Sequence, residues 1–301
     1  MFIAGQSGTF GTAMTKKLLE MGVKQVIGFD RDEKNQVLSK QKVNDERIVR
    51  VVGDIRDYQA LDKAMRLYKP DYVYLASAMK HIDKCEAYPD ECRKTNIDGC
   101  INVINCAIAN KVSKLVFLST DKATNPTTIY GCSKLFLEMY CESVTNEDTE
   151  IIRTRYGNVL GSNGSVVQIW QDQKAKGLPL TVTNPDITRF FMTIDEAIDL
   201  VLYATDNGTN GDLFVFNNKS CTVGELANAI SDNQVITGLR CIEKTDEALL
   251  TLNELEHCEL NGDYFKINKD ITNNFDWEEP LTSDNAMKLT PEEILMMIDG
   301  L

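Results

Sequence analysis

The sequence contains few of the residues from which metal sites and disulfide frameworks are built. Only two of its 301 residues are histidine, and its nine cysteines are scattered without a CxxC pair. Structural zinc sites use closely spaced Cys and His ligands, so we expect no metal centre. An odd number of unpatterned cysteines is typical of reduced thiols. We therefore expect no disulfide framework and a cytoplasmic location.

The sequence also has fewer basic than acidic residues, and it has no long apolar run. Lys and Arg number 32 against 45 Asp and Glu, which gives a formal net charge of -13. A general nucleic-acid binder needs clustered basic residues to displace counterions, so we expect no nucleic-acid partner. No apolar run approaches the roughly 20 residues that cross a bilayer, and the sequence enters its first strand candidate at residues 2–4. We expect neither a signal peptide nor membrane insertion.

The first half of the sequence alternates short apolar segments with helical patterns. The strand candidates are residues 2–4, 25–29, 48–52, 72–76, 114–118 and 150–154. Continuous apolar strands separated by helices predict a parallel sheet that is covered on both faces. The predicted fold is therefore α/β, a doubly wound parallel sheet of the Rossmann type.

The second half of the sequence is less regular. Its helix candidates are residues 165–176, 194–204, 223–230 and 246–256, followed by an irregular tail over residues 268–290 and a last short helix. We expect a dinucleotide-binding Rossmann domain in residues 1–157. A smaller lobe, mainly substrate-binding, is expected in residues 158–301, with some elements returning to the main sheet.

A glycine-rich segment, GQSGTFG at residues 5–11, lies between the first strand candidate and a helical pattern. Glycines at this spacing allow a tight turn, close approach to a pyrophosphate and close packing of the helix on the sheet. The N–H groups at the start of the helix can bind the anion. An ordinary strand-to-helix turn is the alternative, but the strand-loop-helix order favours a dinucleotide site.

The residues that follow the second and third strand candidates bear on the choice of cofactor. Asp30 can bind the ribose hydroxyls of NAD, whereas the guanidinium of Arg31 can pair with the 2′-phosphate of NADP. Asp54 can lie beside the adenine amino group, although a helix N-cap is an equally good interpretation. The expected cofactor is NADP, with NAD as the alternative.

The fifth strand candidate leads into Ser119-Thr120-Asp121-Lys122, and a YxxxK pair follows at Tyr130 and Lys134. Residues four apart on a helix project from the same face, so a lysine ammonium can lower the pKa of the phenol. A surface pair is the alternative for an isolated YxxxK. Together with the strand-end residues and the glycine loop, the pair indicates a catalytic base.

These segments together resemble the extended short-chain dehydrogenase/reductases, and within them the inverting UDP-N-acetylglucosamine 4,6-dehydratases. The strongest match is LSTDKATNPTTIYGCSK at residues 118–134. Further matches are ASAMKH at residues 76–81, KTNI at 94–97, RYGNV at 155–159, residues 161–167, and TRF at 188–190. The resemblance covers roughly residues 1–245.

The resemblance implies a redox-neutral reaction in which the cofactor stays bound and is recycled. Tyr130 removes the C4 hydroxyl proton as hydride leaves C4, and Thr120 hydrogen-bonds near that hydroxyl. Lys122 then takes the C5 proton and Asp121 protonates the departing C6 hydroxyl, after which hydride returns to C6. In inverting members the C5 proton returns to the opposite face, and a retaining outcome is the alternative.

The catalytic residues implied are Thr120, Asp121, Lys122, Tyr130 and Lys134. The expected cofactor-binding residues are Gly5, Ser7, Gly8, Thr9, Phe10, Gly11, Asp30, Arg31, Asp54, Ile55, Ala76, Ser77, Ala78, Lys80, Leu118, Ser119, Tyr130, Lys134 and Tyr156. The expected substrate-binding residues are Lys80, Asn158, Val159, Leu160, Gly161, Ser162, Asn163, Arg189, Arg240 and Glu243.

Two segments depart from the family pattern. An Arg-Pro-Gly-Glu-Lys run of the family corresponds here to RCIEK at residues 240–244, and a serine-arginine pair after the second strand corresponds to Asp30-Arg31. The first departure affects the expected specificity for UDP-N-acetylglucosamine, and the second affects the choice between NADP and NAD.

Other functions use part of the same residue set. A nucleotide-sugar 4-epimerase shares the glycine loop and the Tyr/Lys pair but needs no acid and base for elimination, so Asp121 and Lys122 argue against it. A non-catalytic dinucleotide sensor is disfavoured by the intact Thr120, Tyr130 and Lys134. A homo-oligomer, a dimer or higher, is expected through helices at residues 97–109 and 133–142.

Overall fold

The fold is that of a computed structural model, which describes residues 1–144, 148–162, 164–240, 242–273 and 277–301. It divides into two compact units, each made of two segments. The first unit comprises Met1–Thr154 and Ile198–Phe214, and the second comprises Arg155–Ala197 and Val215–Leu301. Within the described ranges, no helix is both long enough and apolar enough to cross a membrane.

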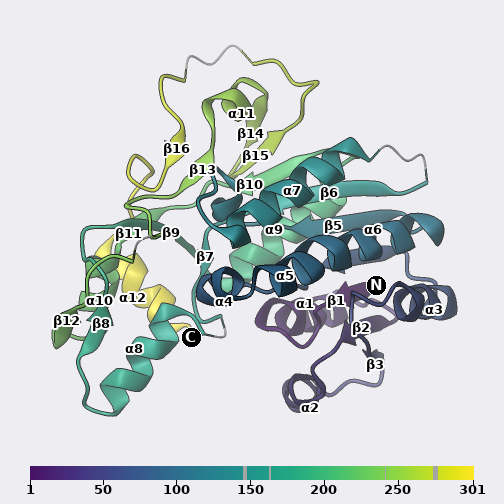
Figure 1. Cartoon of the computed structure of the whole chain (residues 1–301), viewed down its shortest axis with the longest axis horizontal. Coiled ribbons are helices and arrows are strands. Elements are labelled where there is room, and N and C mark those ends of the chain that lie inside the picture. The colour runs from purple at the N-terminus through teal and green to yellow at the C-terminus, as the bar shows by residue number, and fades with distance from the viewer. Residues whose placement is uncertain (145–147, 163, 241, 274–276) are drawn as a thin grey trace. The chain divides into compact units, whose positions relative to one another are not determined.

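The first unit alternates strands and helices along most of its length (Figure 1). Its strands are β1 (Phe2–Ala4), β2 (Val26–Asp30), β3 (Ile48–Val52), β4 (Tyr72–Leu75), β5 (Lys114–Leu118) and β6 (Glu150–Arg155), with β10 (Leu213–Phe216) where the chain re-enters the second unit. Its helices are α1 (Thr9–Glu20), α2 (Glu33–Lys42), α3 (Tyr58–Tyr68), α4 (Ile82–Ala87), α5 (Pro89–Cys92), α6 (Cys100–Ala109), α7 (Ile129–Ser143) and most of α9 (Ile194–Asn207), with a π-helix at Arg93–Gly99 and a 3-10 turn at Asp121–Ala123.

The strands of this unit form a sheet in the order β10-β6-β5-β4-β1-β2-β3. Phe2 of β1 lies opposite Ile27 of β2 on one side and Val73 of β4 on the other, and all pairings from β3 through β6 are parallel. The order reverses between β1 and β4, and such a switch point places the carboxyl ends of the strands around a binding crevice.

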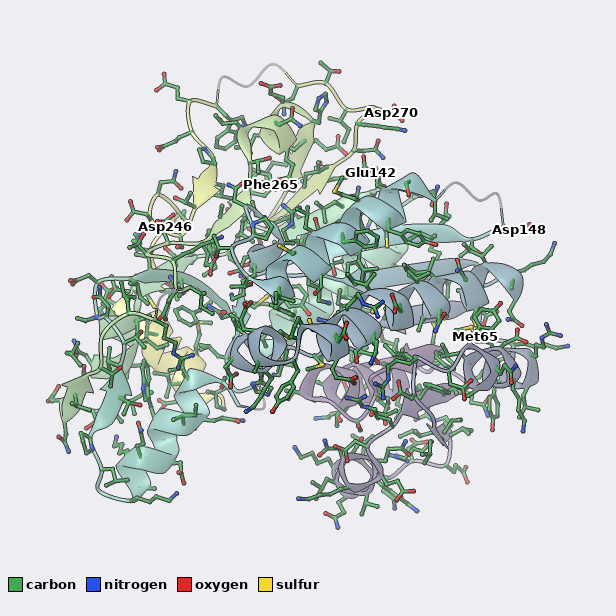
Figure 2. All side chains as sticks on the ribbon, in the orientation of Figure 1. Met65, Glu142, Asp148, Asp246, Phe265 and Asp270 are labelled. Atoms are coloured by element: carbon green, nitrogen blue, oxygen red, sulfur yellow. The ribbon has the colours of Figure 1, made fainter. Side chains whose placement is uncertain are left out.

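One apolar cluster joins β1, β2, β4, β5 and β6 to α3, α6 and α7. Met65 of α3, labelled in Figure 2, belongs to this cluster and is fully buried. The apolar face of α3 therefore packs against the sheet and against α6. This packing fixes the strand ends that carry the candidate site.

The second unit contains shorter elements. Its strands are β7 (Asn158–Val159), β8 (Leu180–Val182), β9 (Thr188–Met192), β11 (Ser220–Thr222), β12 (Gln234–Ile236), β13 (Ala248–Leu250), β14 (Cys258–Asn261), β15 (Tyr264–Ile267) and β16 (Leu281–Thr282). Its helices are α8 (Val166–Ala175), α10 (Val223–Asn228), α11 (Leu252–Glu256) and α12 (Pro291–Asp299). Its core gathers around Trp170 of α8, which is almost completely buried.

The prediction of one helix over residues 246–256 is wrong. Residues 248–250 form β13, which pairs antiparallel with β16, and the helix begins only at Leu252. Thr251 is the N-cap of α11, because its hydroxyl accepts the N–H of Glu254 while the Glu254 carboxylate accepts the N–H of Thr251. This capping box fixes the start of α11. The three residues before Thr251 are buried and form β13.

Candidate active site

The glycine-rich loop connects β1 to α1 and packs against the end of β4. Gly5 has a φ of 89°, and a Cβ atom at this position would lie 2.9 Å from the backbone nitrogen of Ser77. A Cβ at Gly11 would lie 2.4 Å from the carbonyl oxygen of Gly5, whereas one at Gly8 would have no contact closer than 3.4 Å. Gly5 and Gly11 therefore permit the tight turn and the helix packing, whereas a Cβ at Gly8 would be in ordinary contact with the Gly5 carbonyl oxygen.

The N-terminus of α1 is electrostatically suited to an anion. The helix begins at Thr9, its N-cap Gly8 supplies no side-chain cap, and its first turn holds no acidic residue. The positive end of the helix dipole and its first N–H groups are therefore not neutralised by a carboxylate of the helix itself. The predicted phosphate-binding residues lie together in this loop.

Asp30 lies at the carboxyl end of β2 and is held by the glycine loop. Ser7 donates to its Oδ2 from both the backbone N–H, at 3.2 Å, and the hydroxyl, at 2.6 Å. The N–H of Asp32 donates to Oδ1 at 3.1 Å. The side chain of Arg31 instead pairs with Asp54 at 3.3 Å. The structure thus brings Asp30 to the loop and Arg31 to the end of β3.

The predicted catalytic triplet follows β5 directly. The fully buried Asp121 accepts hydrogen bonds at Oδ1 from the Thr120 hydroxyl and from Lys122 Nζ, both at 2.9 Å. Among the described residues, Asp121 Oδ2 and the buried hydroxyl of Ser119 have no hydrogen-bond partner. Buried oxygens without partners are costly, so these two atoms are suited to contact a bound molecule.

Tyr130 and Lys134 lie near the start of α7, which is capped by Thr128 accepting the N–H of Gly131. Both side chains are buried, and Lys134 Nζ donates to the carbonyl of Leu118 at 2.7 Å and lies 4.7 Å from the centre of the Phe117 ring. Lys134 is thereby fixed to the end of β5.

Gly131 allows α7 to approach the turn that carries Asp121 and Lys122. A Cβ atom at this position would lie 2.3 Å from the carbonyl oxygen of Lys122. Only glycine permits this approach of α7 to the Asp121–Ala123 turn. The start of α7, which carries Tyr130, therefore lies beside the Asp121/Lys122 pair at the end of β5. The sequence analysis assigned no role to Gly131.

Comparisons with known proteins identify the family to which the chain belongs. A family model described as "Polysaccharide biosynthesis protein" matches residues 1–269. Proteins named UDP-glucose 4-epimerase from Rickettsia canadensis and Rickettsia prowazekii are each 37% identical over 284 residues, which cover 90% of this chain and 83% of theirs. The chain belongs to this polysaccharide biosynthesis family.

Solved structures share the fold of this family member. The X-ray structure of Pen from Bacillus thuringiensis is 32% identical, with a TM-score of 0.92 over 100% of this chain and 98% of that one. A UDP-glucose 4-epimerase from Thermotoga maritima, solved with UDP-glucose, is 21% identical, with a TM-score of 0.75 over 99% and 97%. DesIV from Streptomyces venezuelae, a dTDP-glucose 4,6-dehydratase with NAD and TYD bound, is 19% identical, with a TM-score of 0.75 over 81% and 86%. The predicted doubly wound α/β fold, of the extended short-chain dehydrogenase/reductase type, is confirmed.

Most of the predicted substrate residues belong to the second unit of this family member. Residues 158–162 form β7 and the turn after it, and Asn163 lies outside the described residues. The buried guanidinium of Arg189 donates to the carbonyls of Thr188, Lys244 and Thr245, so it holds the backbone of the second unit together. Arg240 is exposed, and its N–H donates to the Glu243 carboxylate at 3.4 Å.

The remaining predicted residues divide between the two units. Ala76, Ser77, Ala78 and the exposed Lys80 follow β4, Ile55 is buried beyond β3, and Leu118 ends β5. Tyr156 belongs to the second unit, where burial raises the pKa of its phenol. Binding roles for all these residues stay predictions.

Asn96 of the π-helix is a site-forming residue to which the sequence analysis assigned no role. Its amide nitrogen donates to the carbonyl of Met79 at 2.9 Å and to the hydroxyl of Ser133 at 3.1 Å, and its oxygen accepts the N–H of Met79 at 2.7 Å. The fully buried side chain thus ties the loop after β4 to α7. The KTNI match contained the residue, but only the fold shows its partners.

The burial of Lys134 predicts a pH-dependent contribution to stability. Burial lowers the pKa of its ammonium, and the nearby Cys100 and Glu138 oppose this shift. The unfolded chain then binds more protons than the native one between the lowered pKa and the ordinary value of about 10.4, so the native state gains stability as pH rises through that window.

Comparison with Lys134→Met tests this linkage. The free energy of unfolding of the wild type minus that of the variant should increase in urea titrations as pH rises toward the ordinary lysine pKa of about 10.4. The lost hydrogen bond to Leu118 adds only a pH-independent offset. A difference that stays constant over this range would contradict a lowered pKa.

Proposed function

We propose that this protein is a nucleotide-sugar 4,6-dehydratase that converts UDP-N-acetylglucosamine to a UDP-2-acetamido-2,6-dideoxy-hexos-4-ulose. The observation that carries the proposal is the Asp121 carboxylate, buried at the end of β5 and hydrogen-bonded to both Thr120 and Lys122. This acid/base pair lies beside the start of the Tyr130 helix. Oxidation and re-reduction alone do not need such a pair, whereas removal of water does.

The residues present fit a nicotinamide dinucleotide. Gly8 and the N-terminus of α1 would hold its pyrophosphate, Asp30 a ribose, and Ser119 and Lys134 the nicotinamide end. The unpartnered hydroxyl of Ser119 supports this fit. When bound, the group supplies reversible redox chemistry, taking electrons from C4 of the sugar and returning them to C6.

Tyr130 acts in the first step by removing the proton of the C4 hydroxyl. The charge of Lys134, four residues further along the same helix, favours the phenolate form of Tyr130. Thr120 holds the hydroxyl that reacts. Oxidation at C4 makes the C5 proton acidic, because the resulting carbanion is conjugated with the new ketone.

Lys122 and Asp121 carry out the elimination. Movement of a proton across their 2.9 Å contact would give an uncharged amine and an uncharged carboxylic acid, the two forms that the elimination uses. The amine takes the proton from C5, the C5–C6 double bond forms, and the C6 hydroxyl leaves as water with the proton of Asp121. C6 is then reduced and C5 regains a proton on the opposite face, so the net change is the loss of one water.

In the first unit, Lys80 is the proposed contact to the substrate. Residues 158–163, Arg240 and Glu243 are the proposed contacts to the sugar and its diphosphate, and Arg189 supports the backbone near Lys244. The protein is also proposed to act as a homo-oligomer. On α7, Phe136 and Met139 are exposed by 47% and 63%, respectively.

A 4-epimerase is the second candidate, because the Rickettsia relatives carry the name UDP-glucose 4-epimerase. That reaction would use Tyr130 and Lys134 and would leave Asp121 and Lys122 without a chemical role. The burial of the Asp121 carboxylate favours the dehydratase.

Incubation with UDP-N-acetylglucosamine in deuterated water distinguishes the candidates. The dehydratase should give a product lighter by one water that carries deuterium at C5, because the proton taken by Lys122 exchanges with solvent. The proton couplings of H5 in a product made in ordinary water report inversion or retention. An unchanged mass with a C4 epimer would contradict the dehydratase, and no turnover of any nucleotide sugar would favour a dinucleotide sensor.

A further inference from the structure

Tyr130 is the second residue of α7 and therefore lies in the first turn of its helix. The N–H groups of a first turn have no carbonyl partner within the helix, and helix ends fray. A base that acts on the C4 hydroxyl must stay within hydrogen-bond reach of that hydroxyl. The first turn of α7 therefore has to be held by groups that lie outside the helix.

Side chains from two segments bind N–H groups of this turn. Thr128, the N-cap of α7, accepts the N–H of Gly131 at 3.0 Å. Glu86 of α4 accepts the N–H of Ile129 at its Oε1, at 2.7 Å. Since Ile129 is the first residue of α7, Glu86 binds the backbone directly before Tyr130.

The charge of Glu86 also suits this position. The first turn of α7 contains no acidic residue of its own, so no carboxylate of the helix neutralises the positive end of its dipole. A carboxylate at a helix N-terminus is stabilising, and partial burial strengthens the effect. Glu86 is half-buried. It therefore supplies to α7 both a hydrogen-bond acceptor and a negative charge from a different helix.

The residue before Glu86 contacts Tyr130 itself. Cys85 and Tyr130 belong to one buried apolar cluster, and burial raises the pKa of the Cys85 thiol to about 12, so the thiol is uncharged there. Consecutive residues of α4 thus bind consecutive residues of α7. Cys85 packs with the side chain of Tyr130, and Glu86 holds the backbone of Ile129.

We propose that Glu86 is a positioning residue that holds the first turn of α7, and with it the phenol of Tyr130, in the geometry needed to take the C4 proton. Glu86 acts through the backbone of Ile129 and not through contact with the sugar. The inference rests on the role that the proposed function gives to Tyr130.

Amide hydrogen exchange, followed by NMR, tests the contact between α4 and α7. In Glu86→Ala the N–H of Ile129 loses its acceptor and should exchange at least about tenfold faster, because the helix offers this N–H no other partner. The side-chain oxygen of Glu86→Gln still accepts the N–H, so exchange should stay within about threefold of the wild type. Asp83→Ala is the matched control on α4, because it removes an exposed carboxylate paired with Lys84 at 3.7 Å, and it should change nothing.

Kinetics in a Lys122→Met background test the positioning role. This background isolates the C4 step because methionine cannot take the C5 proton, and absorbance after rapid mixing with UDP-N-acetylglucosamine follows the reduction of the nicotinamide. Adding Glu86→Ala should slow reduction about 10- to 100-fold, the effect of a small displacement of a reacting group. Glu86→Gln in its place should keep the rate within about threefold. The half-saturating sugar concentration should change less than about twofold, since Glu86 acts on Tyr130 and not on the sugar.

A further variant covers the case in which Glu86→Ala does not fold, as judged by circular dichroism. Glu86→Asp keeps the charge but shortens the side chain, so it loses the reach to Ile129 and should slow nicotinamide reduction about tenfold. A rate equal to that of Glu86 with this variant would overturn the inference.

The inference is also overturned if Glu86→Ala leaves the exchange of the Ile129 amide or the rate of nicotinamide reduction unchanged, or if Glu86→Gln is as slow as Glu86→Ala. Water loss from the sugar together with such a result would contradict only this inference. Reduction that slows as expected, in a protein that otherwise releases no water from the sugar, would contradict only the dehydratase. A protein that reduces no nicotinamide with any nucleotide sugar would contradict both.

Discussion

Replacement of Lys122 by methionine is expected to lower the rate of water loss from the nucleotide sugar about 10²- to 10⁴-fold, the usual contribution of a positioned acid or base. Methionine keeps much of the side-chain length but cannot take the C5 proton. Tyr130 and Lys134 are untouched, so oxidation at C4 should still occur. The variant should therefore accumulate a 4-keto sugar that retains its C6 hydroxyl, in an amount no greater than that of the enzyme.

Single-turnover mass spectrometry of the quenched mixture measures this species. Lys111→Met is a matched control, because Lys111 forms an exposed ion pair with Asp148 at 3.0 Å on the same unit, and its loss should leave turnover unchanged. Multiple turnovers by Lys122→Met at the wild-type rate would remove Lys122 from the mechanism. Asp121 would then have to be considered as the base.

Replacement of Tyr130 by phenylalanine is expected to stop the reaction one step earlier, with a similar loss of about 10²- to 10⁴-fold. The ring of Tyr130 packs with Cys85 and Cys92, so phenylalanine should keep this packing and remove only the hydroxyl. Neither the 4-keto sugar nor the dehydrated product should form in a single turnover. The two variants thus assign the C4 and C5 steps to different residues.

Tyr140→Phe on the same helix is the control for this substitution. Its hydroxyl donates to Asn105 at 3.3 Å near the surface, away from the β5 end, and its loss should leave the rate within about twofold of the wild type. A 4-keto sugar formed at the wild-type rate by Tyr130→Phe would show that another group takes the C4 proton.

The fold was predictable because each of the strands β1 to β6 is a short apolar run next to a helical pattern, whereas β10 was not predicted. The glycine loop was predictable for a similar reason, since the glycine spacing reflects local turn and packing geometry. The helix over residues 246–256 was misassigned, because helical spacing of apolar residues outweighed the Thr251/Glu254 capping box that marks its true start.

The parts of the site that the sequence could not supply depend on contacts between distant segments. The approach of Gly131 to Lys122 and the bonds of Asn96 to Met79 and Ser133 follow from the packing of α7 and the π-helix. In the sequence, Asp30 favours NAD and Arg31 favours NADP. The ion pair between Arg31 and Asp54, which bears on this choice, is visible only in the structure. Sequence spacing predicts which residues lie at a strand end, but it does not predict their hydrogen-bond and ion-pair partners.

The division of each unit into two segments has a consequence for synthesis on the ribosome. The second segment of the first unit, residues 198–214, follows residues 155–197 of the second unit in the sequence. Within this segment, the backbones of Gly211 and Asp212 form hydrogen bonds with Ile151 and Arg153 of β6. Until they emerge, β6 is an unpaired sheet edge, the kind of surface that promotes association between chains. The nascent protein therefore cannot complete its first unit until Phe214 has been made.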